Sequence, residues 1–134
     1  MRAAVVTRSG GTTRPVLLVL VVGALGAAPA GAARSPACAR GLLPLETNSI
    51  SAAAEAGLAR EDLSTKPLVV GAMLASLDQS RGVIAKRECG TRVWHRTVVV
   101  YIRLQAFLPS ASLSSRVSFV GRFKSGYRVW QIAH

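Results

Sequence analysis

The side chains of this chain that could bind or react gather in its last third, between His95 and Gln131. Basic, hydroxyl and aromatic residues alternate there with apolar ones, and alternate residues of a β-strand point to the same face of a sheet. Arginines interleaved with tyrosines can bind an anionic partner such as nucleic acid, lipid headgroups or an acidic wall polymer. The predicted binding residues on this basic face are Tyr101, Arg103, Arg116, Arg122, Lys124 and Tyr127.

The charge balance of the chain fits a basic face but also allows a simpler interpretation. The 134 residues include 17 Lys and Arg against 6 Asp and Glu, a formal net charge of +11. From Arg81 onward Glu88 is the only acid, so the positive charge belongs to the strand-rich half. The alternative is that this face is merely the solvated side of a half-buried antiparallel sheet, kept soluble by its charge.

The first 32 residues are organised like a secretory signal peptide. Three arginines precede a short apolar run at 16–22, and small residues follow at 28–33. A basic region, a short apolar core and an A-x-A site are typical of such a peptide, and we predict cleavage after Ala32. An uncleaved membrane anchor is the alternative, but the apolar run is shorter than the roughly 20 residues of a spanning helix. We therefore predict an extracytoplasmic or secreted protein with no stable membrane span, an irregular lead-in over 33–45 and one domain over 46–134.

Cys38 and Cys89 are the only cysteines of the chain. In an exported protein an even number of cysteines favours a disulfide. The chain has no CxxC motif and no histidine pair near either cysteine, so a metal site is not indicated. We predict a Cys38–Cys89 bond, which in the chain-entropy description stabilises the fold by about 4 kcal/mol.

Motifs for enzyme chemistry are missing from the sequence. The serines at 110–115 lie in neither a GxSxG nor an SxxK pattern, and Glu88 is the only acid near the predicted strands, which disfavours a paired-carboxylate hydrolase. No phosphate-binding glycine loop, zinc motif or dinucleotide fingerprint occurs. We therefore predict no catalytic residues, no metal and no cofactor, in a protein that acts by binding or as a cell-envelope accessory.

Two alternative functions stay open. The chain is similar to small, secreted, basic microbial ribonucleases in its size, basicity, export signal and terminal histidine, His134, and that resemblance implies hydrolysis of RNA. It departs from them because the segment 97–132, where their architecture places a catalytic glutamate, contains none. The second alternative is a pocket for an apolar small molecule between helices and sheet, beside Met73 and Trp130.

Two helices are predicted ahead of the strands. Candidate N-cap residues at 46–49 precede an alanine-rich segment with helical spacing, which predicts a helix over 49–61. Pro67 suits the first turn of a second helix that ends near Gly82. Its apolar stripe has the spacing i, i+3, i+4, i+7 and consists of Val70, Met73, Leu74 and Leu77. A short strand is predicted to begin at 83–85.

Three antiparallel strands are predicted between Arg92 and Ile132. A connection at 109–112 places Ile102 opposite Phe119, and a turn at 125–126 places Gly121 between Val100 and Trp130, so that the indole covers the glycine. In both registers the large apolar side chains share one face, which a slip of one residue would scatter. The predicted core is Val98, Val100, Ile102, Leu104, Val117, Phe119, Phe123, Trp130 and Ile132.

The resulting fold class is α+β, with two N-terminal helices packed on a C-terminal antiparallel sheet of three to four strands. Helices followed by a curved sheet that ends in the aromatic strand 126–132 resemble cystatin/NTF2-like domains over the last third of the chain. The signal layout, the turn at 109–114 and the hairpin at 119–130 are also similar to small exported bacterial proteins of unassigned function. Neither resemblance supplies catalytic residues.

Overall fold

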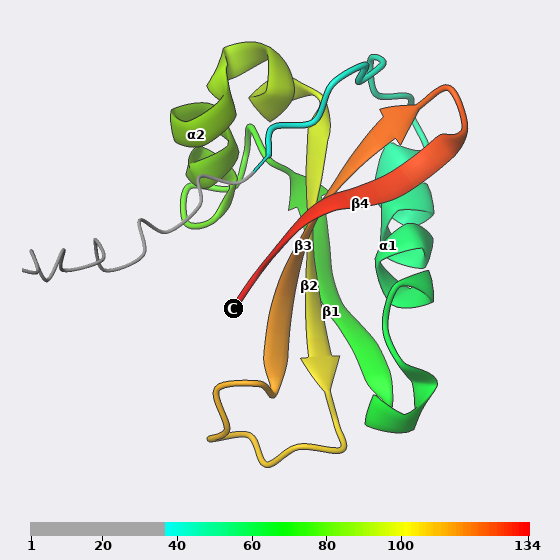
Figure 1. Ribbon diagram of the computed structural model, residues 1–134, viewed down its shortest axis with the longest axis vertical. Coiled ribbons are helices and arrows are strands. Elements are labelled where there is room, and N and C mark those ends of the chain that lie inside the picture. The colour runs from blue at the N-terminus through cyan, green and yellow to red at the C-terminus, as the bar shows by residue number, and fades with distance from the viewer. Residues whose placement is uncertain (1–36) are drawn as a thin grey trace, which may run out of the picture. The chain divides into compact units, whose positions relative to one another are not determined.

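The computed structural model describes residues 37–134, which form a four-stranded antiparallel sheet with a helix against each face (Figure 1). The strands follow the order β1-β2-β3-β4 across the sheet, so neighbours in the chain are neighbours in space. The predicted signal peptide and its cleavage site lie outside the described residues. The elements are α1 (Ser49–Ala59), the 3₁₀ helix η1 (Leu63–Thr65), β1 (Pro67–Leu74), α2 (Gly82–His95), β2 (Thr97–Leu104), β3 (Ser115–Phe123) and β4 (Gly126–Ala133).

The α+β class and the first helix are confirmed, whereas the predicted second helix is wrong. Residues 67–74 form strand β1 at the edge of the sheet. The stripe that suggested a helix is not buried as a unit, since Val70 is 60% and Leu77 71% exposed. The tertiary reason lies in β2, a buried strand whose backbone groups need hydrogen-bond partners on both sides. Strand β1 provides those partners along one side of β2.

The strand predicted to begin at 83–85 is instead the first turn of α2, so the second helix lies between β1 and β2. Gly82 starts this helix where its backbone packs on Ala75, and a Cβ there would overlap the Ala75 carbonyl. The helix is kinked at Gly90, whose φ of 85° is a left-handed conformation that glycine adopts without strain. Trp94 then anchors the second half, because its indole N–H donates to the Ala75 carbonyl over 2.7 Å.

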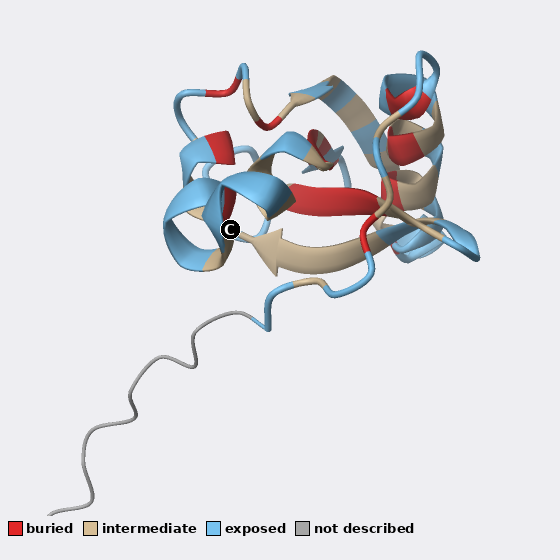
Figure 2. Cartoon of the chain, turned by 90° about the horizontal axis from the view of Figure 1, so that it is seen from above, coloured by how far each residue is buried: buried red, intermediate tan, exposed pale blue. Residues whose placement is uncertain are grey.

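Small residues let α1 lie close against the sheet. The buried positions of this helix are Ser49, Ala53 and Gly57, which recur every four residues and so form one stripe. At Gly57 a Cβ would lie 3.2 Å from Cγ1 of Val100, closer than most side-chain contacts. Figure 2 shows the buried residues of α1 facing the buried strand across this interface.

The predicted register between β2 and β3 is wrong by three residues. Phe119 lies opposite Val99, and Arg116 takes the place opposite Ile102 where Phe119 was predicted. The pairing stops at Arg103 and Ser115 because residues 105–114 do not continue the hairpin. They form their own turns, in which Ala111 N–H donates to the Leu108 carbonyl and Ser114 N–H to that of Ala111. A shift of three is odd, so it moves every side chain of β3 to the opposite face.

The predicted register between β3 and β4 is also wrong. The two-residue turn is Lys124–Ser125, so Gly126 is paired with Phe123. The backbone φ angle of Gly126 is 104°. A bulge opposite Phe119 and Val120 then leaves Trp130 outside the pairing. The predicted contact of the indole with Gly121 nevertheless occurs, since a Cβ at that glycine would lie 3.5 Å from the Trp130 ring and would overlap Leu42.

The corrected registers divide the predicted core between two faces of the sheet. Six of the nine predicted core residues are buried, and Phe123, Trp130 and Ile132 are half-buried. On the α1 face, Ala53 packs with Val98, Val100, Ile102, Leu104 and Val120. On the α2 face, Ala85 packs with Ala75, Val99, Val117 and Phe119. Strand β2 is therefore buried on both faces, which explains its continuous apolar run.

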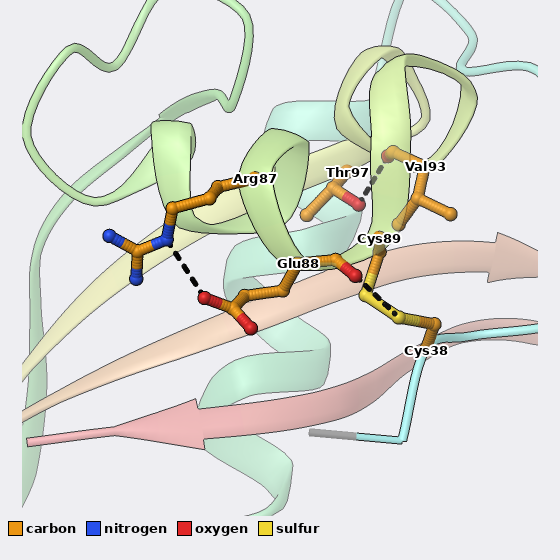
Figure 3. The surroundings of a disulfide bond; sticks show 6 residues. All are labelled: Cys38, Arg87, Glu88, Cys89, Val93 and Thr97. Atoms are coloured by element: carbon orange, nitrogen blue, oxygen red, sulfur yellow. Dashed lines mark hydrogen bonds and ion pairs between the residues drawn. A yellow bond between two sulfur atoms is a disulfide. The ribbon is translucent and has the colours of Figure 1, made fainter. Parts of the chain in front are cut away.

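The predicted disulfide between Cys38 and Cys89 is confirmed, with a Cα–Cα distance of 5.4 Å. Figure 3 shows that it joins the lead-in to α2 immediately before the kink at Gly90. The Cys38 sulfur also lies 3.4 Å from the Glu88 carbonyl oxygen. Beyond the kink, the Thr97 hydroxyl donates to the Val93 carbonyl over 2.7 Å and ties the end of α2 to β2. The bond thus holds the lead-in against the helix that covers the second face of the sheet.

Removing the disulfide should destabilise the domain. A Cys38→Ser, Cys89→Ser variant lacks a cross-link between cysteines 51 residues apart, and the chain-entropy description puts that loss at about 4 kcal/mol. Urea unfolding of the oxidised parent and the variant measures the difference. A free energy of unfolding within about 1 kcal/mol of the parent would contradict the expectation.

Enlarging Gly57 should push α1 away from the sheet. The Cβ added by Gly57→Val would lie 3.2 Å from Cγ1 of Val100, and the valine carries two further methyl groups beyond it. Overpacking of this kind costs about 1–3 kcal/mol. Thermal unfolding followed by circular dichroism measures the loss. The matched control is Ala59→Val, on an exposed position of the same helix, which should cost under about 1 kcal/mol, the range of helix propensity.

Candidate anion-binding site

The six predicted binding residues do not share one face of the sheet. Arg116 lies opposite Ile102, and Arg122 pairs with Tyr127, all on the face that α1 covers. Tyr101 and Arg103 lie on the opposite face, and Lys124 is in the exposed β3–β4 turn. The prediction of a single basic face is therefore wrong, because the odd register shift reversed β3 relative to β2. The residues form two sets: the first, on the α1 face, is Arg116, Arg122 and Tyr127, and the second, on the other face, is Tyr101 and Arg103.

The set on the α1 face holds the fold together. The Arg116 guanidinium contacts the Glu61 carboxylate over 2.9 Å, and the Glu61 side chain is only 1% exposed. Arg122 forms an ion pair with Glu46 and donates to the Pro44 carbonyl. The Tyr127 and Ser49 hydroxyls lie 2.5 Å apart. These interactions tie α1 and its flanking segments to β3 and β4, so the basic side chains involved have acidic partners within the protein.

The second set lines a hollow of about 450 Å³ on the face opposite α1. Arg103 on β2 and Arg81 at the start of α2 border it, and no ion pair engages either guanidinium in the described part of the chain. Val70, Tyr101 and Val117 contribute apolar and aromatic surface. The lining is completed by Ile102, Pro109, Ser114, Ser115 and Arg116.

Tyr101 is held in place at the hollow by a buried carboxylate. Its hydroxyl donates to Oδ2 of Asp78 over 2.6 Å, and burial together with this neighbouring carboxylate raises the pKa of Tyr101. Oδ1 of Asp78 accepts from the backbone N–H groups of Ser80 and Arg81 and from the Ser80 hydroxyl. The turn that these bonds stabilise sets the position of Arg81 beside Tyr101.

The hydrogen bonds at Asp78 also determine its charge. Burial alone would raise the pKa of this carboxyl, but the donors from Tyr101, Arg81 and Ser80 outweigh it and lower the pKa from 3.8 to about 2. Asp78 is therefore an anion at neutral pH, and it contacts the hydroxyl of Tyr101. The two positive charges of Arg81 and Arg103 outnumber the single negative charge of Asp78, so these three residues together carry a net charge of about +1.

Sequence reasoning identified Tyr101 and Arg103 but missed Arg81, Ser114 and Ser115. The sequence analysis placed Arg81 at the end of a helix that does not exist, and it placed both serines after the connection at 109–112, beside a turn. A signal was present in Asp78, which precedes Ser80 and Arg81 with the spacing of an Asx turn. That pattern could have predicted a turn before Gly82, although not that Arg81 lies beside β2.

A second hollow, of about 520 Å³, lies between α1 and the β3–β4 hairpin. It is lined by Trp130, as the prediction of an apolar pocket required, but Met73 is on β1 and not part of it. Arg60 and Arg128 also line it, and the Arg128 guanidinium lies 4.6 Å from the centre of the Phe123 ring. The hollow is thus partly cationic.

The residues required by a ribonuclease-like site do not contact one another. His95 is exposed and packs against Trp94 with ring centres 4.7 Å apart. His134 is exposed, and Glu88 pairs with Arg87 over 2.8 Å. No interaction in the described residues joins either histidine to Glu88. Over residues 37–134 there is also no cluster of three His, Cys, Asp or Glu side chains able to hold a metal ion.

No protein-family model, no curated protein and no solved structure matches the chain. Among the described residues no helix combines the length and the apolar character needed to cross a bilayer. The geometry of the hollow beside Arg81 and Arg103 is therefore the main guide to function.

Replacing Asp78 should weaken the domain and flatten its acid response. Because the folded-state pKa is lowered to about 2, the carboxylate stabilises the fold above pH 4, and this contribution of about 2 kcal/mol is lost as the pH falls from 4 to 2. Asp78→Asn should therefore lower the free energy of unfolding at pH 7 and reduce its slope between pH 4 and 2. Urea titrations at several pH values measure both. Glu55→Gln, on the exposed side of α1, is the matched control and should retain the parent's slope.

Proposed function

We propose that this chain is an exported domain that acts by binding an anionic ligand, an acidic polymer in particular, at the hollow beside Arg81 and Arg103. One observation carries the proposal: two arginines whose guanidinium groups form no ion pair in the described residues border the same 450 Å³ hollow. Of the other residues predicted on the basic face, Arg116 and Arg122 are engaged by Glu61 and Glu46, and Lys124 lies in the exposed β3–β4 turn. Binding at this hollow requires no catalytic group.

The lining of the hollow suits an anion attached to a partly apolar body. Its volume falls in the range of about 300–1,000 Å³ that is usual for ligand sites. Guanidinium groups bind carboxylates and phosphates through paired hydrogen bonds, while the Tyr101 ring and Val117 supply a surface against which a sugar or peptide unit can pack. Ser114 and Ser115 also line the hollow, and the Ser114 hydroxyl donates to the Pro109 carbonyl over 3.1 Å. An open site of this kind accommodates successive units of a chain.

Export is the second part of the proposal. The Cys38–Cys89 bond is consistent with an oxidising, extracytoplasmic environment, where such bonds persist. The signal-like N-terminal sequence supports the same location. Acidic polymers are abundant at cell surfaces, so the compartment and the charge of the hollow fit together.

Kinship with cystatin/NTF2-like domains is proposed on the order of the elements. Helix α1 precedes the antiparallel meander β1–β4, which is the helix-then-sheet arrangement that the resemblance implies. The insertion of α2 between β1 and β2 is a departure from a simple meander. This kinship adds no binding residue to the hollow.

The binding proposal predicts that the two arginines of the hollow contribute more to the affinity for an anionic polymer than a basic residue elsewhere on the surface does. Arg103→Ser and Arg81→Ser should each weaken binding of dextran sulfate about tenfold at low salt and lower the slope of log affinity against log salt by about one. Lys124→Ser removes the same charge from the exposed β3–β4 turn and serves as the matched control, with a much smaller effect. Titration by fluorescence or calorimetry, with neutral dextran as the blank, measures the affinities.

Two outcomes would contradict the proposal. Equal losses for all three variants would mean that the polymer responds to the overall charge of a solvated surface. Unchanged affinity in the two hollow variants would place any binding elsewhere, the hollow beside Arg60 and Arg128 being the next region to test.

A further inference from the structure

The end of the sheet where β2 passes into β3 carries an unusual group of exposed apolar side chains. The loop 105–114, η1 and the start of β1 lie together there, at the bottom of Figure 1. Leu63 is 83% exposed and Leu108 75%. The whole group, which we call the apolar tip, consists of Leu63, Leu68, Phe107, Leu108 and Leu113.

Backbone hydrogen bonds hold the segments of the apolar tip together. The N–H groups of Gln105 and Ala106 donate to the carbonyls of Lys66 and Thr65, over 3.2 and 3.1 Å. At the base of the loop, Leu104 N–H donates to the Ser114 carbonyl over 2.8 Å. The tip is thus built from two chain segments that support each other, and its exposed leucines belong to a defined surface.

We propose that the apolar tip inserts into the headgroup region of a lipid bilayer that contains anionic lipids. Apolar groups exposed together in this way mark an interaction site. Apart from Leu68 on β1, the tip residues belong to η1 and the loop 105–114, which project beyond the end of the sheet (Figure 1). Side chains on such projecting segments can enter a fluid interface without a complementary surface. Five partly exposed side chains supply less than the roughly 800 Å² per partner of a stable protein dimer.

The charges around the tip favour an anionic lipid surface. Lys66 and Arg103 are exposed beside it, and Arg103 lies opposite Leu68 in the sheet. The one exposed acid nearby is Asp62, whose carboxylate accepts from the Ser64 N–H over 2.9 Å. Glu61 is buried and paired with Arg116. Basic side chains at the level of the headgroups are attracted to anionic lipids, and this attraction adds to the burial of the leucines.

Lipid insertion goes beyond the proposed binding of an anionic polymer. The hollow needs Arg81 and Arg103 to hold a dissolved anion, whereas insertion depends on the leucines and the phenylalanine of the tip. The Arg81→Ser variant can therefore lose polymer binding while its tip still enters a bilayer. Conversely, a tip that fails to insert leaves the dextran sulfate titration unaffected.

The test places a fluorescent side chain at the tip of the full chain. Leu108→Trp is compared with Leu77→Trp, because Leu77 is 71% exposed and lies beyond the other end of β1. Both variants retain Trp94 and Trp130 as a common background. Vesicles of phosphatidylglycerol and phosphatidylcholine with brominated acyl chains quench tryptophan that enters the bilayer. We expect quenching at Leu108→Trp to exceed that at Leu77→Trp at least about twofold, since interfacial segments reach roughly 5–10 Å into the boundary of the acyl chains.

Three outcomes of this experiment would contradict insertion of the tip into an anionic bilayer. Equal quenching of the two variants would overturn the proposal, because any attachment through the N-terminal region affects both alike. Equal quenching of Leu108→Trp by vesicles with and without phosphatidylglycerol would overturn the role of anionic lipid. Self-association of the parent that Leu108→Ser abolishes, with no quenching of Leu108→Trp, would assign the tip to a second copy of the chain instead.

Discussion

The burial of β2 on both faces is the constraint on which the rest of the structure depends. Residues 97–100 of this strand are completely buried, so their backbone groups require partners from β1 and β3, and their side chains require cover from above and below the sheet. Strand β1 follows from the first requirement. The small-residue stripe of α1 and the kinked α2, tied to the lead-in by Cys38 and Cys89, follow from the second.

The arginines divide into those paired with carboxylates of the fold and those whose guanidinium groups form no ion pair in the described residues. Arg116 and Arg122 reach toward α1 and its flanking segments, where Glu61 and Glu46 neutralise them. Removing Glu61 would leave a partly buried guanidinium without its partner, which is costly in a way that an exposed charge is not. Arg81 and Arg103 have no such partner in the described residues and face the part of the sheet that α2 leaves open. The open face is therefore one place where positive charge is available to a ligand, and the hollow beside Arg60 and Arg128 is another.

The hollow and the apolar tip are adjacent parts of the same end of the molecule. Pro109 and Ser114 line the hollow and belong to the loop that also carries Leu108 and Leu113. A domain seated on a lipid surface through this loop would hold the arginines close to the anionic groups of that surface. Apart from Arg103, the two proposals rest on different side chains, and the geometry allows both kinds of binding to operate together.

The sequence by itself determined the α+β class, the first helix, the disulfide and six of the nine predicted core residues, because these depend on local periodicity and composition. Only the tertiary structure decided the partners. Residues 67–74 became a strand because β2 lacked hydrogen bonds on that side, and a loop with its own turns moved β3 by three residues relative to β2. The alternation of apolar and polar residues could not predict this odd shift, because a strand that is buried on both faces is apolar at successive positions and accepts either register. It separated Arg116 and Arg122 from Arg103, and the fold then brought Arg81, which no local pattern connected with the sheet, to the edge of the same hollow.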